Sequence, residues 1–147
     1  MVEVFDRIYL GSLNCAFHAQ TLVAKDIKFI LDLSQEQFSK QEDRFRYFDI
    51  QFGPQEIEEV KKYFSLTNRL LSQSLEAGGA VLILYSRAQT VALAFALAHE
   101  LVTGTTPLKA LLVKAQNKGL SVDIHQSLMK QLDLIDMGRQ VNINDKI

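Results

Sequence analysis

The feature that most constrains the fold is an apolar strand followed closely by a helix that is apolar on nearly all sides. Ala80 to Tyr85 reads AVLILY, a continuous apolar run preceded by Gly78-Gly79. Such a strand is typical of the centre of a parallel sheet that carries helices on both faces. Val91 to Val102 is apolar nearly all round, which predicts a buried central helix. The two segments together predict an α/β layer fold.

Alternating strand and helix signals continue this pattern along the chain. Further strands are expected at 2–5, 7–10, 28–33 and 45–50, with a polar loop at 35–43. Further helices are expected at 14–24, 54–77, 107–116 and 123–137. Their predicted starts are an Asn14 N-cap, Pro54 in the first turn, Thr106 as N-cap before Pro107, and a capping box of Asp123 with Gln126. We expect one domain over 1–138 and a polar C-terminal tail over 139–147 that frays from Gly138.

Composition narrows the classes of partner and the compartment. Sixteen basic and seventeen acidic residues leave a formal net charge of −1, so no overall field attracts nucleic acid. The longest apolar run, Val91 to Ala98, is far shorter than the roughly 20 residues of a membrane span. Cys15 is the only cysteine, and the N-terminus lacks the features of a secretory signal. We therefore expect an intracellular protein, cytoplasmic or nuclear, without a membrane span.

Several short motifs, in their order and spacing, resemble the dual-specificity phosphatase family. Ile8 to Leu13 (IYLGSL) is similar to the family's "LYLGS", and Ile27 to Ser34 (IKFILDLS) is similar to its "GIKYILNLS" strand. Other matches are Tyr47 to Ile50 before the general-acid loop, Gly78 to Ile83 before the catalytic cysteine, and Gln131-Leu132 in the closing helix. The resemblance covers about Ile8 to Ile135. It implies a protein-tyrosine-phosphatase-like fold with a central, mostly parallel sheet and helices on both faces.

The resemblance also implies a specific chemistry, carried in that family by the signature H-C-x-x-G-x-x-R-S. The cysteine thiolate attacks phosphorus, and the positive end of the following helix lowers its pKa. Backbone N–H groups of a glycine-bearing loop surround the phosphate, and the arginine binds two of its oxygens. An aspartic acid on another loop protonates the leaving oxygen.

An alignment without gaps finds these chemical positions vacant. Tyr85 falls at the nucleophile, Ala88 at the glycine and Val91 at the arginine. Pro54 falls at the general acid. On this alignment the chain is a catalytically degenerate, pseudophosphatase-like member of the family, and Tyr85 is expected to fill the old pocket with its ring.

A second alignment keeps the arginine and shortens the loop. Ser86 to Val91 (SRAQTV) resembles the family's "SRSxTV", which places Arg87 at the arginine position and deletes about four loop residues. It requires a compensating insertion between Ala98 and Ala110. Both alignments leave Tyr85 in place of the cysteine, and neither restores an enzyme.

Two groups of residues remain as candidate sites. Ser86, Arg87 and Thr90 precede or begin a helix, where free N–H groups bind anions. Phe48, Phe52 and Pro54 flank the vacant acid loop and form a candidate partner surface. Cys15 is expected in the core, away from the loop.

No metal or cofactor is expected. The three histidines, His18, His99 and His125, are too scattered for a metal site, and a single cysteine supplies no ligand pair.

The main functional hypothesis is an inactive phosphatase-like domain that acts as a protein-interaction or scaffolding module, with a protein partner of unknown identity. One alternative is a phosphoprotein or anion reader that uses Ser86, Arg87 and Thr90. Another is a weak phosphatase with altered chemistry that uses Tyr85.

Overall fold

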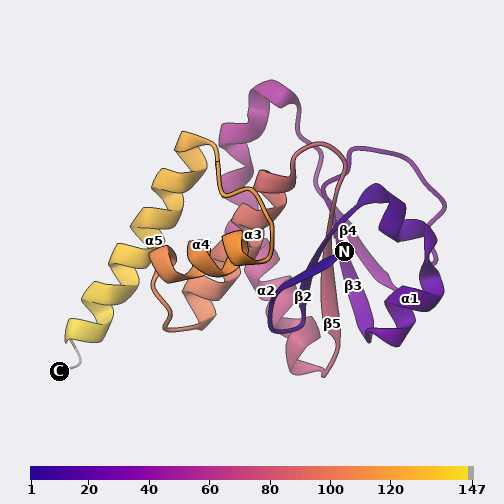
Figure 1. Cartoon of the computed structure of the whole chain (residues 1–147), viewed down its shortest axis with the longest axis horizontal. Helices are drawn as coiled ribbons and strands as arrows, with labels where there is room; N and C mark the ends of the chain where they lie inside the picture. The colour runs from indigo at the N-terminus through magenta and orange to yellow at the C-terminus, as the bar shows by residue number, and fades with distance from the viewer. Residues whose placement is uncertain (146–147) are drawn as a thin grey trace.

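The computed structural model describes the backbone of residues 1–145, and their side chains except those of Pro54, Gln55 and 140–145. A five-stranded sheet with the strand order β1-β2-β5-β3-β4 forms its centre (Figure 1). The strands are β1 (Val2–Phe5), β2 (Ile8–Ser12), β3 (Ile27–Asp32), β4 (Arg46–Asp49) and β5 (Ala80–Tyr85). Only β1 and β2 pair antiparallel. The sheet is therefore mixed but mostly parallel, which confirms the expected fold class.

Burial on both faces explains why the central strand β5 is apolar at every position. Val81 and Ile83 pack into the larger of two core clusters, whereas Leu82 and Leu84 pack into the smaller one on the opposite face of the sheet. All four side chains are completely buried. Because successive residues of a strand point to opposite faces, a strand covered on both sides needs apolar residues at every position.

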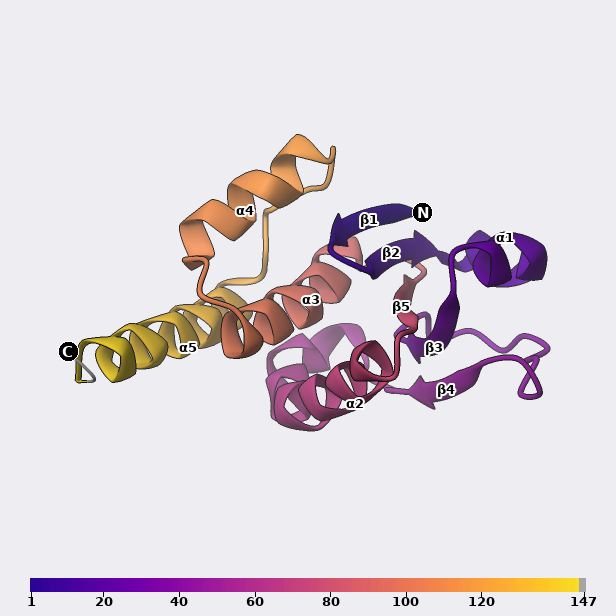
Figure 2. The same ribbon diagram turned by 90° about the horizontal axis from the view of Figure 1, so that it is seen from below.

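Helices cover both faces of the sheet, as Figure 2 shows. The larger cluster lies under η2 (Pro54–Tyr63), α2 (Phe64–Glu76), α3 (Gln89–Thr103), α4 (Leu108–Asn117) and α5 (Gln126–Asp145). The short helices η1 (Leu13–Phe17) and α1 (Ala19–Ala24) cover the smaller cluster. Every residue of α3 from Val91 to His99 is buried, so the predicted central helix is confirmed. Phe95 meets Phe64 of α2 edge to face, with ring centroids 4.9 Å apart.

Three predicted helices differ from the structure in their first turns. The helix expected at 14–24 is divided at His18, whose backbone leaves the helical region (φ −110°, ψ 64°). The segment from Pro54 begins as a 3₁₀ helix and becomes α-helical only at Phe64. Pro107, and not Thr106, is the N-cap of α4, so the helix begins one position later than expected, because the ψ of Pro107 is extended at 152°.

The start and the end of α5 also differ from those predicted from the sequence. The Ser127 N–H donates to Nδ1 of His125 at 3.1 Å, so His125, and not Asp123, caps the first turn. The segment expected to fray from Gly138 is helical as far as Asp145. Arg139 anchors it, because its guanidinium donates to the carbonyl oxygens of Leu101, Gly104 and Thr106 at the end of α3.

Within residues 1–145, no helix has both the length and the apolar character that a membrane crossing requires.

Candidate functional site

The candidate site lies where β5 gives way to α3. Three residues, Ser86 to Ala88, connect the end of the strand to the first residue of the helix. Tyr85 is paired with Ser12 of β2, and Leu84 with Asp32 of β3. Because parallel strands end at one edge of a sheet, the loops that follow β2, β3, β4 and β5 gather around this connection.

Tyr85 stands at the end of β5 with its ring half-buried against the larger core cluster. Burial raises the pKa of its phenol, and an electrostatic interaction with Cys15 raises it further. A raised pKa keeps the phenol protonated near neutral pH, where a nucleophile would need to lose its proton.

The interaction with Tyr85 shows that the expected place of Cys15, away from the loop, is wrong. η1 follows β2 directly, and β2 pairs in parallel with β5, so the residues after Ser12 reach the end of β5. Cys15 is half-buried and packs at the border of the smaller core cluster.

Two further positions of the ungapped alignment, Ala88 and Val91, lie at the start of α3. Ala88 is its N-cap and supplies no side-chain hydrogen bond to the first turn. Val91 is 2% exposed and belongs to the larger core cluster. Arg87, which holds the arginine position in the second alignment, is exposed. The ungapped alignment keeps five residues between Tyr85 and the arginine position but places the buried Val91 there, whereas the second alignment keeps an exposed arginine with only Ser86 between it and Tyr85.

A cavity of about 510 Å³ opens beside this connection. The loops after β3, β4 and β5 and the 3₁₀ helix η2 line it. Its lining residues are Leu33, Ser34, Gln35, Glu36, Phe52, Ile57, Ser86, Arg87 and Ala88. We call this space the loop cavity. It brings together Phe52, Ser86 and Arg87 of the sequence-predicted site residues, whereas Thr90 is not among its lining residues.

Gln35 holds one wall of the loop cavity in place. Its Nε2 donates to the Ile50 carbonyl at 3.0 Å, and its Oε1 accepts from the Phe52 N–H at 3.1 Å. The loop after β3 is thereby fixed to the segment after β4. Gln35 has a φ of +64°, a conformation unusual for a residue with a side chain. This unfavourable backbone conformation occurs at the residue whose side chain positions the cavity wall.

The loop after β3 is also held by a buried hydrogen-bonded pair, Asp32 and Ser34. Ser34 donates its backbone N–H and its hydroxyl to Oδ1 of Asp32, at 2.9 and 2.6 Å. Both residues are at most 3% exposed. A carboxylate at this depth requires such donors, because a buried charge without hydrogen bonds is costly.

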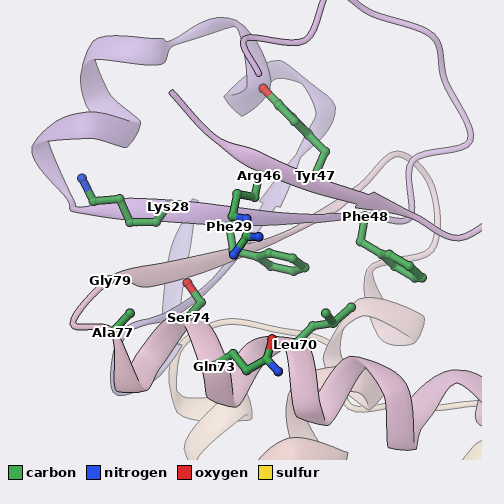
Figure 3. A pocket seen from close by; sticks show the side chains of 10 residues that line it. All are labelled: Lys28, Phe29, Arg46, Tyr47, Phe48, Leu70, Gln73, Ser74, Ala77 and Gly79. Atoms are coloured by element: carbon green, nitrogen blue, oxygen red, sulfur yellow. The ribbon is translucent and has the colours of Figure 1, made fainter. Parts of the chain in front are cut away.

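The residues of the expected partner surface do not lie together in the structure. Phe48 lies in a separate pocket of about 280 Å³ between the sheet and α2 (Figure 3). There the rings of Phe29 and Phe48 lie on the sheet side and Leu70 on the helix side. The side chain of Pro54 lies outside the described residues. Of the two described members of the predicted surface, Phe52 lines the loop cavity and Phe48 does not.

Sequence reasoning missed Gln35 and Glu36 because their segment, 35–43, looked like an ordinary polar loop, and it took Ser34 only as the end of the preceding strand motif. One signal was available. A loop that directly follows a buried parallel strand lies at the edge of the sheet where sites form. Among the described residues, no group of three histidine, cysteine, aspartate or glutamate side chains is placed to hold a metal ion.

No protein-family model and no curated protein matches this chain. Solved structures do match over nearly its full length. Human DUSP28 superposes with a TM-score of 0.82 at 16% identity, covering 95% of this chain and 94% of its own. The Yvh1 phosphatase domain from Chaetomium thermophilum gives 0.73 at 16% identity, covering 93% and 95%. Human tyrosine phosphatase-like serine/threonine/tyrosine-interacting protein gives 0.79 at 20% identity, covering 90% and 93%.

These matches define the fold of the chain as that of the dual-specificity phosphatases. The structures that share it include a named phosphatase domain and a phosphatase-like interacting protein. Fold alone therefore does not decide between catalysis and binding, and the decision depends on the residues of the site.

Proposed function

We propose that this chain is a catalytically inactive phosphatase-like domain that binds a partner protein at the loop cavity. The observation that carries the proposal is the connection between β5 and α3. Tyr85 ends the strand, only three residues follow before the helix begins, and Val91 in the helix is buried. The sequence resemblance places these residues where the family has its cysteine, its glycine-bearing loop and its arginine.

The chemistry of the family has no substitute among the residues of the loop cavity. Phosphoryl transfer through a covalent intermediate needs a nucleophile with a lowered pKa, and the pKa of the Tyr85 phenol is raised instead. A cradle of backbone N–H groups needs a loop that curls around the phosphate. Ser86 to Ala88 is short for that purpose.

The lining of the loop cavity suits a protein segment. Phe52 and Ile57 offer half-buried apolar surface, and Arg87 and Glu36 place one charge of each sign at the exposed rim. Such a mixture is typical of interfaces, where a buried apolar anchor is surrounded by polar contacts. The fold also occurs in a structure named as a phosphatase-like interacting protein.

A hydrolysis assay tests the loss of catalysis. Wild-type protein with p-nitrophenyl phosphate should release no p-nitrophenol above the buffer rate. Tyr85→Cys should remain inactive, because a thiol alone lacks the arginine and the acid. Turnover by the wild type that disappears in Tyr85→Phe would overturn the proposal, provided that circular dichroism shows both proteins to be folded.

A binding assay tests the docking surface. The double variant Phe52→Ala/Arg87→Ala should lose partners that the wild type captures from a lysate of the native cell. Val113→Ala/Lys114→Ala is the matched control, because both of these side chains are exposed on α4. Equal loss in the two variants, or retention in both, would argue against the loop cavity as the docking site.

A second candidate function is anion reading through Ser86 and Arg87. Arg87 is exposed and forms no ion pair within the part of the chain that the structure describes. Titration with free phosphotyrosine should then shift the backbone NMR signals of 86–90 in the wild type and leave them in place in Arg87→Ala. Unchanged signals in the wild type would remove this candidate.

A further inference from the structure

A second hollow, of about 460 Å³, lies on the helical side of the molecule. It runs along α2 and the last turn of η2, has α5 as its other wall, and reaches Val102 of α3. We call it the α2–α5 groove. It shares no lining residue with the loop cavity, so it is a separate surface. Its lining residues are Lys61, Phe64, Ser65, Asn68, Arg69, Ser72, Val102, Gln131 and Ile135.

Asn68 is the strongest indication that this groove binds a ligand. The residue is 8% exposed, and its Oδ1 is buried without a hydrogen-bond partner among the described residues. A buried acceptor without a hydrogen bond lowers the stability of the fold. A leucine at this buried position would avoid this cost. The amide therefore has a use that folding alone does not explain.

The polar character of the groove extends from Asn68 to Ser72, one helical turn further along α2. The Ser72 hydroxyl lies 3.0 Å from Nε2 of His99, which is 3% exposed in α3. The Nδ1 of His99 has no hydrogen-bond partner among the described residues. Polar groups thus reach from the surface of the groove into the packing between α2 and α3.

The charges of the groove have one sign. Lys61 and Arg69 are its only charged lining residues, and both side chains are exposed. With Ser65 between them they are spaced four residues apart, so they follow one stripe of the helical surface. Neither cation forms an ion pair in the described part of the chain.

The groove also offers apolar contact area. Val102 is 57% exposed, which is unusual for a large apolar side chain at the end of the central helix. The half-buried Ile135 of α5 adds to this apolar surface, and the buried Phe64 of α2 lies at the bottom of the groove. A ligand for the groove therefore needs an apolar part as well as a negative charge.

From these observations we propose that the α2–α5 groove binds an acidic segment of a partner protein. Carboxylates of the segment accept hydrogen bonds from Lys61 and Arg69, and a backbone N–H at the start of the segment donates to Oδ1 of Asn68. An apolar side chain of the segment covers Val102 and Ile135. The stripe from Lys61 to Ser72 is about 16 Å long at 1.5 Å per residue, enough for an amphipathic helix of about three turns.

Selection from a random twelve-residue peptide library displayed on phage tests this proposal. The wild-type chain should enrich peptides that combine Asp or Glu with Leu, Ile or Phe at helical spacing. The charge-reversed variant Lys61→Glu/Arg69→Glu should bind the enriched peptides at least tenfold more weakly by fluorescence anisotropy. The matched control Lys109→Glu/Lys114→Glu changes the net charge equally on α4, which Figure 2 shows on the other side of α3, and should bind as the wild type does.

Asn68→Leu separates binding from folding. Because it removes the unpaired amide, its melting temperature should be equal to or higher than that of the wild type, while its affinity for the enriched peptides falls at least threefold. The proposal is overturned by enrichment of basic peptides, by no enrichment over the charge-reversed variant, or by equal affinity in Asn68→Leu. Binding of a matched phosphopeptide tenfold tighter than the acidic peptide would replace the carboxylate by a phosphate as the ligand.

Discussion

Arg139 offers a sharp test of how the C-terminal helix is attached. Its guanidinium donates to the carbonyls of Leu101 and Gly104 at 3.1 Å, to that of Thr106 at 2.8 Å, and to Oδ1 of Asp136 at 2.8 Å. Its side chain is 13% exposed. The three carbonyls belong to the end of α3 and the residues after it, where the negative end of the helix dipole favours a cation. Arg139 therefore ties α5 to the central helix.

The expected cost of Arg139→Ala follows from these contacts. Hydrogen bonds to a charged group are worth about 1.5–3 kcal/mol each when they are buried. Leu101 is completely buried, so water cannot easily replace its bond, whereas the carbonyls of Gly104 and Thr106 are nearer to solvent. We expect a loss of about 2–4 kcal/mol in the free energy of unfolding, which corresponds to a fall of about 6–12 °C in Tm for a domain of this size.

Urea unfolding followed by circular dichroism measures this loss directly. Arg139→Lys should recover part of the stability, because an ammonium can satisfy one of the carbonyls. Lys130→Ala, an exposed change on the same helix, should leave the midpoint within the error of the wild type. A change below 0.5 kcal/mol in Arg139→Ala would refute the anchoring role, since surface substitutions fall in about that range.

Three further predictions follow from other contacts. Gln35→Ala should lower the free energy of unfolding by about 1–3 kcal/mol, because it removes both hydrogen bonds to the segment after β4; Gln37→Ala is the control, and no difference between the two in urea unfolding would contradict the clamp. Gly11→Ala should destabilise by about 1–3 kcal/mol, because its Cβ would lie 2.9 Å from Cys15 Sγ, and adding Cys15→Ala should recover part of the loss in the same assay; a double variant no better than Gly11→Ala would place the strain elsewhere. Burial raises the folded-state pKa of the Tyr85 phenol above its ordinary value of about 10, so the stability it gives is present below that pH and is lost as the pH rises through the folded-state pKa. Urea midpoints should therefore fall less between pH 9 and pH 11 in Tyr85→Phe than in the wild type, and an equal fall would refute the assignment.

The α/β architecture could be predicted from the sequence because burial leaves a direct mark on composition. β5 and α3 are apolar on all sides since each is enclosed on all sides, and their predicted positions agree with the structure to within two residues. The resemblance in motif order also predicted that β5 leads into the candidate site, because the order of motifs is enough to align one strand with another.

The first turns of helices were less predictable. Thr106, Asp123 and Asn14 are good capping residues, but a cap depends on the conformation of the backbone and on neighbours that the local sequence does not name. At α5 the nitrogen of His125 takes the role expected of Asp123. At the C-terminal end, a polar composition suggested a frayed tail, whereas Arg139 is held by carbonyls about 35 residues away in the chain.

The residues themselves therefore determine the layers, the central strand and helix, and the absence of a cysteine after β5. Tertiary structure decides which distant segments meet. It brings Cys15 to Tyr85, fixes the loop after β3 to the segment after β4 through Gln35, and places Asn68 of α2 in the α2–α5 groove with its Oδ1 unpaired. The physical reason is that hydrophobic patterning is local and repeats along each element, whereas a site is made of single contacts between elements that only the packed chain brings together.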